Sequence, residues 1–215
     1  MDYINTYIER DIKDLAQVGK LNEFYDFLVY MAARTGQELK YDEIASTIGV
    51  SAPTAKSWVS ILERSGVIFI LRPYFSNITK RLVKTPKVYF MDTGFAAYLC
   101  RWPNAETLEN GAMDGAFFET YVVTEIVKSY YNAGKPADLF YYRDIDKKEI
   151  DLLIVESDKM YPIEIKKSKE PAKPDKNFSV LRQFKMDIQP GVILCMSDEL
   201  IPYNRESWYC PVSVL

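Results

Sequence analysis

The chain has 215 residues, of which 48% are hydrophobic and 14% aromatic, and its formal net charge is -3. This length suits one large domain or two small ones, with enough apolar side chains to bury a core. The slightly acidic balance excludes a polycation that coats nucleic acid. No apolar run approaches the roughly 20 residues that a membrane-spanning helix needs, and no signal-peptide pattern opens the sequence. We therefore expect a cytoplasmic protein without a membrane partner.

The chain contains no histidine and three widely spaced cysteines, Cys100, Cys195 and Cys210. The lack of histidine excludes Ser-His-Asp and Cys-His catalysis as well as an HExxH zinc site. The cysteines form no CxxC pair and indicate small buried residues in a reducing compartment. A metal site would therefore consist of carboxylate and carbonyl oxygens, which favour Mg²⁺, Mn²⁺ or Ca²⁺.

The first hundred residues are predicted to be mainly helical. Residues 2–18 carry apolar side chains at helical spacing and predict an amphipathic lead-in helix, as expected if the chain is the end of a longer protein. Residues 20–34, 41–48 and 52–65 predict three more helices, with Gly49 as a stop and Ser51 as an N-cap. An apolar strand at 67–71 follows. This order is typical of a helix-turn-helix with a wing.

The third of these helices offers few groups for reading DNA. Its outward residues Thr54, Lys56 and Ser57 include one base, whereas direct readers usually carry Arg, Asn or Gln. Residues 72–87 contain five bases and no acid, so this segment is predicted to contact phosphates as a wing. The predicted nucleic-acid-binding residues are Thr54, Lys56, Ser57, Lys80, Arg81, Lys84 and Lys167. A packing module that reads no sequence is the alternative.

The polar segment 101–111 predicts a domain boundary, after a strand at 87–91 and a short helix at 95–100. Beyond it, residues 115–131 predict a helix with Glu119 on its apolar stripe. Strands are expected at 139–143, 150–155, 160–166, 191–196 and 208–212, with a helix at 177–184. The predicted organisation is a lead-in helix (1–18), a winged helix-turn-helix domain (19–105) and an α/β domain with a mixed central sheet (111–215). The chain is α+β overall.

The predicted hairpin at 150–166 carries charges inside apolar strands. Glu164 and Lys166 share one face of the second strand, while Ile163 and Ile165 take the other face. Asp151 interrupts the first strand. Buried charges are costly unless they are paired or bind a metal. The residues alone leave two alternatives open, an oxygen-ligated metal ion or an ion pair between Asp151 and Lys166.

Asp151 is followed after twelve residues by Glu164-Ile165-Lys166, and Glu119 precedes it on a predicted helix. This arrangement resembles the PD-(D/E)xK superfamily with its restriction-endonuclease-like fold. The proline of the motif is absent, since Ile150 precedes Asp151. The resemblance implies Asp151, Glu164 and Lys166 as catalytic residues for phosphodiester hydrolysis. It also implies Glu119, Asp151, Glu164 and the Ile165 carbonyl as ligands of Mg²⁺ or Mn²⁺. The three carboxylates are therefore expected to converge.

A longer set of stretches, including NITKRLVKTPKVYFMDTGFAAYL, FFETYVVTEIVKSYY and YYRDIDKKEIDLLIV, is similar to the domain of unknown function at the C-terminus of prokaryotic P-loop (AAA-type) ATPases. The resemblance covers nearly the whole chain. No G-x-x-x-x-G-K-[ST] motif is present, so ATP would bind only through an upstream module. The implied partners are that ATPase module and DNA, and an oligomer is compatible with this organisation.

Three functions are compatible with these patterns. The first is a nucleic-acid-binding module with a metal-dependent nuclease-like domain. The second is a catalytically inactive nuclease-fold scaffold that binds DNA or a protein partner, in which Asp151 and Lys166 form a structural ion pair. The third, a transcriptional regulator, is weakened by the poor chemistry of the predicted recognition helix.

Overall fold

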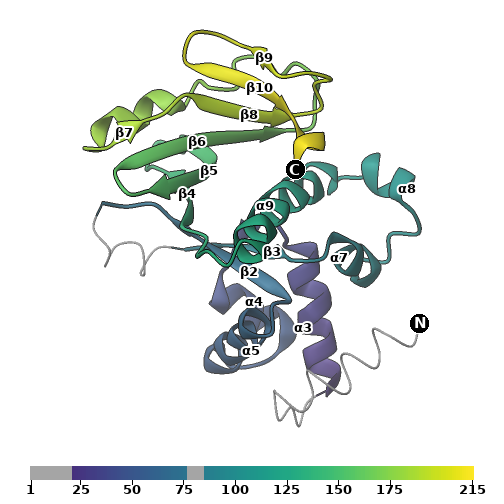
Figure 1. Ribbon diagram of the computed structural model, residues 1–215. Helices are drawn as coiled ribbons and strands as arrows, with labels where there is room; N and C mark the ends of the chain where they lie inside the picture. Colours follow the sequence, from purple (N-terminus) through teal and green to yellow (C-terminus); the bar gives the residue numbers. More distant parts are fainter. Residues whose placement is uncertain (1–20, 77–84) are drawn as a thin grey trace.

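The computed structural model describes residues 21–76 and 85–215. The predicted lead-in helix and the predicted phosphate contacts Lys80, Arg81 and Lys84 lie outside these ranges. Helices from the first third of the chain gather at one end of the molecule, the later strands gather at the other, and the long helix α9 lies between them (Figure 1).

Three helices open the described part: α3 (Leu21–Ala33), α4 (Tyr41–Ile48) and α5 (Ala52–Arg64). They confirm the predicted helices to within one residue at each end. Ser51 caps α5 as expected, since its side chain accepts a hydrogen bond from the Thr54 backbone N–H. Gly49 ends α4 in the left-handed conformation (φ 78°), which glycine adopts without a Cβ clash. The helices bury their apolar faces in one shared core.

Strands and short helices follow: β1 (Gln37–Glu38), β2 (Ile68–Pro73), β3 (Lys87–Phe90), α7 (Thr93–Leu99) and α8 (Ala105–Glu109). The predicted strand at 67–71 thus starts one residue later and continues for two residues more. The polar segment 101–111 is not wholly irregular, because α8 forms within it and is capped by the Asn104 side chain.

The rest of the chain comprises α9 (Asp114–Asn132), β4 (Leu139–Arg143), β5 (Glu149–Glu156), β6 (Lys159–Lys166), β7 (Asp187–Ile188), β8 (Gly191–Cys195), β9 (Ile201–Pro202) and β10 (Ser207–Pro211). The hairpin β5–β6 is present as predicted and turns at Ser157 and Asp158. The predicted helix at 177–184 is instead the 3₁₀ helix η2 (Phe178–Gln183), and a second one, η3, spans Val212–Val214. A connector of six residues without a side-chain N-cap favours the tighter 3₁₀ turn.

One mixed sheet runs through the described residues in the order β1-β3-β2-β4-β5-β6-β8-β10-β9, and β7 pairs with β6. Strands β4, β5 and β6 are antiparallel, whereas β6, β8 and β10 are parallel. The mixed sheet was predicted. Its continuation into the N-terminal strands was not: β2 pairs with β4 through Arg72 with Phe140 and Pro73 with Tyr141. The segment 101–111 therefore separates two stretches of chain that share one sheet.

The two faces of the hairpin β5–β6 have different surroundings. Ile163 and Ile165 belong to an apolar core with Val123 and Val127 of α9. Alternation along β6 then places Glu164 and Lys166 on the opposite face, as expected. Met160 packs with Leu181 of η2 on that opposite face. None of the described helices is long and apolar enough to cross a membrane.

Candidate functional site

Asp151, Glu164 and Lys166 meet on the paired strands β5 and β6. Lys166 Nζ lies 3.1 Å from Asp151 Oδ2 and 2.7 Å from Glu164 Oε1. Asp151 Oδ2 also accepts a hydrogen bond of 2.8 Å from the backbone N–H of Ile165. Both acids are buried, with exposed fractions of 8% and 6%. The structure thus brings these three side chains together, and the Asp151–Lys166 ion pair is one of the two alternatives that the sequence leaves open.

One oxygen of this group has no hydrogen-bond partner. Glu164 Oε2 is buried, and nothing within the described part of the chain donates to it. Burial raises the pKa of Glu164 to about 7, and the neighbouring charge of Asp151 adds to the shift, while Lys166 opposes it. An unpaired, buried carboxylate oxygen is costly unless it is protonated or bound by a cation.

Glu119 lies on α9 as predicted, but its partners come from β3. Lys87 Nζ is 3.1 Å from Glu119 Oε1, and the Tyr89 hydroxyl donates a hydrogen bond of 2.6 Å to the same oxygen. Lys87 Nζ also lies 2.7 Å from Glu149 Oε1, at the start of β5. Burial raises the pKa of Glu119, although Lys87 opposes this shift. Lys87 therefore bridges two acids that come from two elements.

We call these six residues the acid–lysine cluster: Lys87, Glu119, Glu149, Asp151, Glu164 and Lys166. The cluster does not contain the predicted three-carboxylate centre, because no three Asp, Glu or Cys side chains in residues 21–76 and 85–215 are placed to hold a metal ion together. The physical reason is Lys87, which takes Glu119 as its own partner. Asp151 and Glu164, with its unpartnered oxygen, still fit a divalent ion as a pair of carboxylates. The role of the Ile165 carbonyl stays a prediction.

The sequence interpretation missed Lys87 and Glu149 as members of the cluster. From the sequence, Lys87 is one of the five bases of segment 72–87, and Glu149 is the residue before the predicted hairpin. Neither is predicted to contact Glu119 or Asp151. The signal that points to Lys87 is its place at the start of the strand KVYF, where all four residues are buried. A lysine in a strand of this kind needs an acid partner, since a buried unpaired charge is strongly destabilising.

The predicted nucleic-acid-binding residues that fall in the described part of the chain lie on α5 and just after β6. Thr54 lies in the first turn of α5 and bonds Ser51, while Lys56 and Ser57 are exposed on the same helix. Lys56 Nζ lies 5.5 Å from the ring centroid of Tyr41. Lys167 follows β6 and forms an ion pair with Asp114 at the start of α9. Lys167 is therefore engaged within the chain, whereas Lys56 and Ser57 remain accessible.

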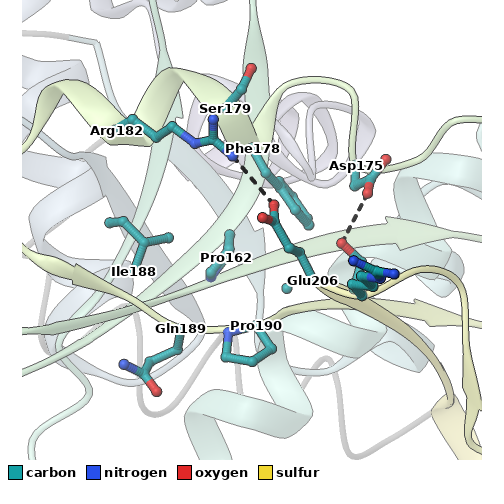
Figure 2. A pocket seen from close by; sticks show the side chains of 12 residues that line it. Pro162, Asp175, Phe178, Ser179, Arg182, Ile188, Gln189, Pro190 and Glu206 are labelled. Carbon is teal, nitrogen blue, oxygen red and sulfur yellow. Dashed lines mark hydrogen bonds and ion pairs between the residues drawn. The ribbon is translucent and has the colours of Figure 1, made fainter.

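A pocket of about 340 Å³ lies elsewhere on the sheet, beside η2. Figure 2 shows Phe178, Arg182 and Glu206 around it. The Arg182 guanidinium lies 3.4 Å from the Glu206 carboxylate. Asp175 on its rim accepts a hydrogen bond of 2.9 Å from Ser207. The pocket contains no member of the acid–lysine cluster, and its cations and anions are balanced.

A second hollow, of about 590 Å³, borders the cluster through Tyr141 and Arg143. Arg143 pairs with Glu38 at 2.7 Å and lies 3.7 Å from Glu149. The Tyr141 ring faces Lys87 Nζ at 5.5 Å from its centroid. Side chains of β4 and β5 therefore border Lys87.

Two family models match different stretches of the chain. Residues 1–106 match the domain of unknown function DUF8612, and residues 114–215 match the domain of unknown function DUF4143. Two uncharacterized proteins, Mb2031c of Mycobacterium bovis and Rv2008c of Mycobacterium tuberculosis, are each 29% identical to this chain over 170 residues. The alignments cover 79% of this chain and 38% of each relative, so the chain spans little more than a third of their length. No solved structure matches.

DUF4143 is known as an ATPase-associated C-terminal domain, and the stretch similar to it carries Glu119, Asp151, Glu164 and Lys166.

Proposed function

We propose that this chain is the C-terminal region of a prokaryotic AAA-type ATPase and that its second half cleaves phosphodiester bonds of DNA with Mg²⁺ or Mn²⁺. The observation that carries the proposal is the contact of Asp151, Glu164 and Lys166 on paired strands. The ATPase partner is supported by the similarity of residues 114–215 to an ATPase-associated domain. The greater length of the relatives leaves room for such a module.

The proposed site assigns a role to each side chain. Asp151 and Glu164 would hold the divalent ion, with Glu164 Oε2 as the ligand atom that has no protein partner in the described chain. When bound, such an ion supplies water activation and neutralisation of developing charge on the phosphate. The Lys166 side chain is 41% exposed, so its ammonium group can face a phosphate oxygen while it orients both acids. Burial of the acids keeps competing water away from their carboxylates.

DNA contact is proposed for the N-terminal part. The order α3, β1, α4, α5, β2 and β3 supports the proposal of a winged helix-turn-helix fold. Lys56 and Ser57 are exposed on α5, the helix in the position of the recognition helix. With a single base on this face, the contact is proposed to be with phosphates more than with base edges.

A catalytically inactive scaffold is the second candidate, and one observation favours it. Glu119 is held by Lys87 and Tyr89 and does not join Asp151 and Glu164 in a three-ligand group within the described residues. Under this reading the acid–lysine cluster is a set of structural ion pairs between α9, β3, β5 and β6. Such a domain would serve the ATPase by binding DNA or a protein partner without cleavage.

Cleavage of plasmid and linear DNA in Mg²⁺ or Mn²⁺ separates the two candidates. The wild-type chain is compared with Asp151→Asn, Glu164→Gln and Lys166→Met, and a hydrolytic site predicts a rate loss of roughly 100-fold or more in each variant. Lys128→Met is the matched control, because it breaks an ion pair with Glu125 that includes no member of the acid–lysine cluster. Equal rates in wild type and all three site variants would assign the cleavage to a contaminant. A wild-type chain that binds DNA or a partner without cleaving would support the scaffold.

A further inference from the structure

The acid–lysine cluster has two halves, each organised around one lysine. Lys166 pairs with Asp151 and Glu164, and 41% of its side chain is exposed. Lys87 pairs with Glu119 and Glu149, and only 6% of its side chain is exposed. The two halves thus have the same composition, two carboxylates and one ammonium group, but their exposure differs. Lys166 is exposed above two buried acids, whereas Lys87 is buried between two partly exposed acids, Glu119 (21%) and Glu149 (29%).

Lys87 is fully engaged in its half. Two carboxylates lie within 3.1 Å of its ammonium group, which also faces the Tyr141 ring. Burial alone would lower the pKa of Lys87, but the carboxylates of Glu119, Glu149 and Asp151 outweigh burial and raise it. The group is therefore a permanent cation in the interior of the protein.

The cluster as a whole contains more negatively than positively charged groups. Its four carboxylates and two ammonium groups leave a formal charge of -2. Burial is the largest cause of the raised pKa of both Glu119 and Glu164, and the charge of Asp151 adds to both shifts. Without Lys87, its half would keep two partly exposed carboxylates that face one position, with Arg143 3.7 Å from Glu149, and a carboxylate pair of this kind can bind a divalent cation.

We propose that the buried ammonium group of Lys87 occupies the position between Glu119 and Glu149 that a divalent metal ion would otherwise take, so that Lys87 holds both acids in place and prevents metal binding there. Lys87 is thus a positioning residue that limits the cluster to one metal position, at Asp151 and Glu164. Only this last point rests on the proposed function. A purely structural ion pair would join β3 to α9 and β5 in the same way but would exclude no metal.

Replacing Lys87 by a neutral side chain of similar length tests the difference. Metal-free wild-type chain, Lys87→Met, Lys87→Arg and the double variant Lys87→Met/Glu119→Gln are titrated with MnCl₂ by calorimetry. We expect Lys87→Met to bind one more Mn²⁺ per chain than the wild type, and the double variant to lose this gain. Lys87→Arg keeps the positive charge and should match the wild type. The matched control is Lys167→Met, which removes a lysine paired with Asp114 outside the cluster.

The outcomes separate this inference from the proposed function. A wild-type chain that binds no Mn²⁺, beside a Lys87→Met variant that binds one ion through Glu119, would sustain the role of Lys87 and remove the metal site at Asp151 and Glu164. An unchanged number of bound ions in Lys87→Met would overturn the inference. A gain that persists without Glu119 would also overturn it.

Folding of the variant provides a second readout. Loss of Lys87 leaves two partly exposed carboxylates without the cation that bridges them, so Lys87→Met is expected to lose secondary structure or melt at a lower temperature without metal. If Lys87 stands where a divalent ion would bind, millimolar Mn²⁺ should restore the circular dichroism spectrum and raise the melting temperature of this variant selectively. A variant that stays unfolded in Mn²⁺ would contradict the inference.

Discussion

The ammonium group of Lys166 lies 3.1 Å from Oδ2 of Asp151, the same oxygen that accepts the backbone N–H of Ile165. One buried carboxylate oxygen therefore anchors both the backbone of β6 and the candidate catalytic lysine. The position of Lys166 depends on Asp151 as well as on its neighbour Glu164.

Asp151→Ala is expected to lower the free energy of unfolding by about 1–3 kcal/mol, because it leaves the buried Ile165 N–H without an acceptor. Asp151→Asn retains a carbonyl oxygen at this position and should cost less. Urea denaturation of the metal-free variants measures both values. Equal losses for Ala and Asn would show that the backbone hydrogen bond contributes little.

The stability of the metal-free protein should fall as the pH rises through the range set by Glu164. Its pKa is about 7 in the folded chain, raised from the ordinary 4.5 mainly by burial and by Asp151, with a smaller effect of Glu149 and opposition from Lys166. The folded state thus holds a proton that the unfolded state has released between these values. The stabilisation from protonated Glu164 is complete below pH 4.5 and lost above pH 7.

At about 1.4 kcal/mol per pKa unit, this contribution amounts to about 3 kcal/mol. Urea denaturation at a series of pH values measures it. Glu164→Gln is the control, because an amide does not titrate, and its stability should vary less over the same range. Parallel curves for wild type and Glu164→Gln would show that Glu164 is not the group responsible.

Local sequence signals predicted most of the elements that carry the cluster. Alternation in the stretch from Ile150 to Lys166 predicts the hairpin and its two faces. The cost of buried charge gives the Asp151–Lys166 ion pair as one of two alternatives. The helical stripe around Val123 placed Glu119 on a buried face of α9. Each of these inferences depends on residues that are near one another in sequence, where periodicity is informative.

The missed features are contacts between distant segments. The pairing of β2 with β4 and the bridge from Lys87 to Glu119 and Glu149 join residues separated by long stretches of chain. Which distant strands pair, and in which register, cannot be predicted from the pattern of a single sequence. A convergence of three acids was therefore inferred from motif spacing alone, and the lysine that takes one of them was not foreseen.

Thr35→Val is expected to destabilise the fold by about 1–3 kcal/mol. Thr35 Oγ1 is fully buried, accepts the Phe90 backbone N–H at 3.2 Å and lies 2.9 Å from Thr120 Oγ1 on α9. Valine has the same shape and leaves the Phe90 N–H unpaired. Thr124→Val is the control, since the buried hydroxyl of Thr124 bonds only within its own helix in the described structure. Thermal or urea denaturation should show a smaller loss for the control.

Gly191→Ala is expected to displace η2 from the sheet. A Cβ at this position would lie 2.6 Å from Cδ2 of the Phe178 ring and closer still to Cε2, inside van der Waals contact. Figure 2 shows that Phe178 lies in the wall of the pocket beside η2, so movement of the ring would reshape this pocket. Such overpacking costs about 1–3 kcal/mol.

Because the clash involves one ring, a smaller side chain at position 178 should relieve it. Phe178→Leu alone is expected to lower the melting temperature by removing packing against Gly191, whereas Phe178→Leu combined with Gly191→Ala should lose less than the sum of the two single losses. A double-mutant cycle from urea denaturation measures this coupling. Strict additivity would mean that β8, and not the Phe178 ring, moves to accommodate the alanine. Gly191 would then not be required for the packing of η2 against the sheet.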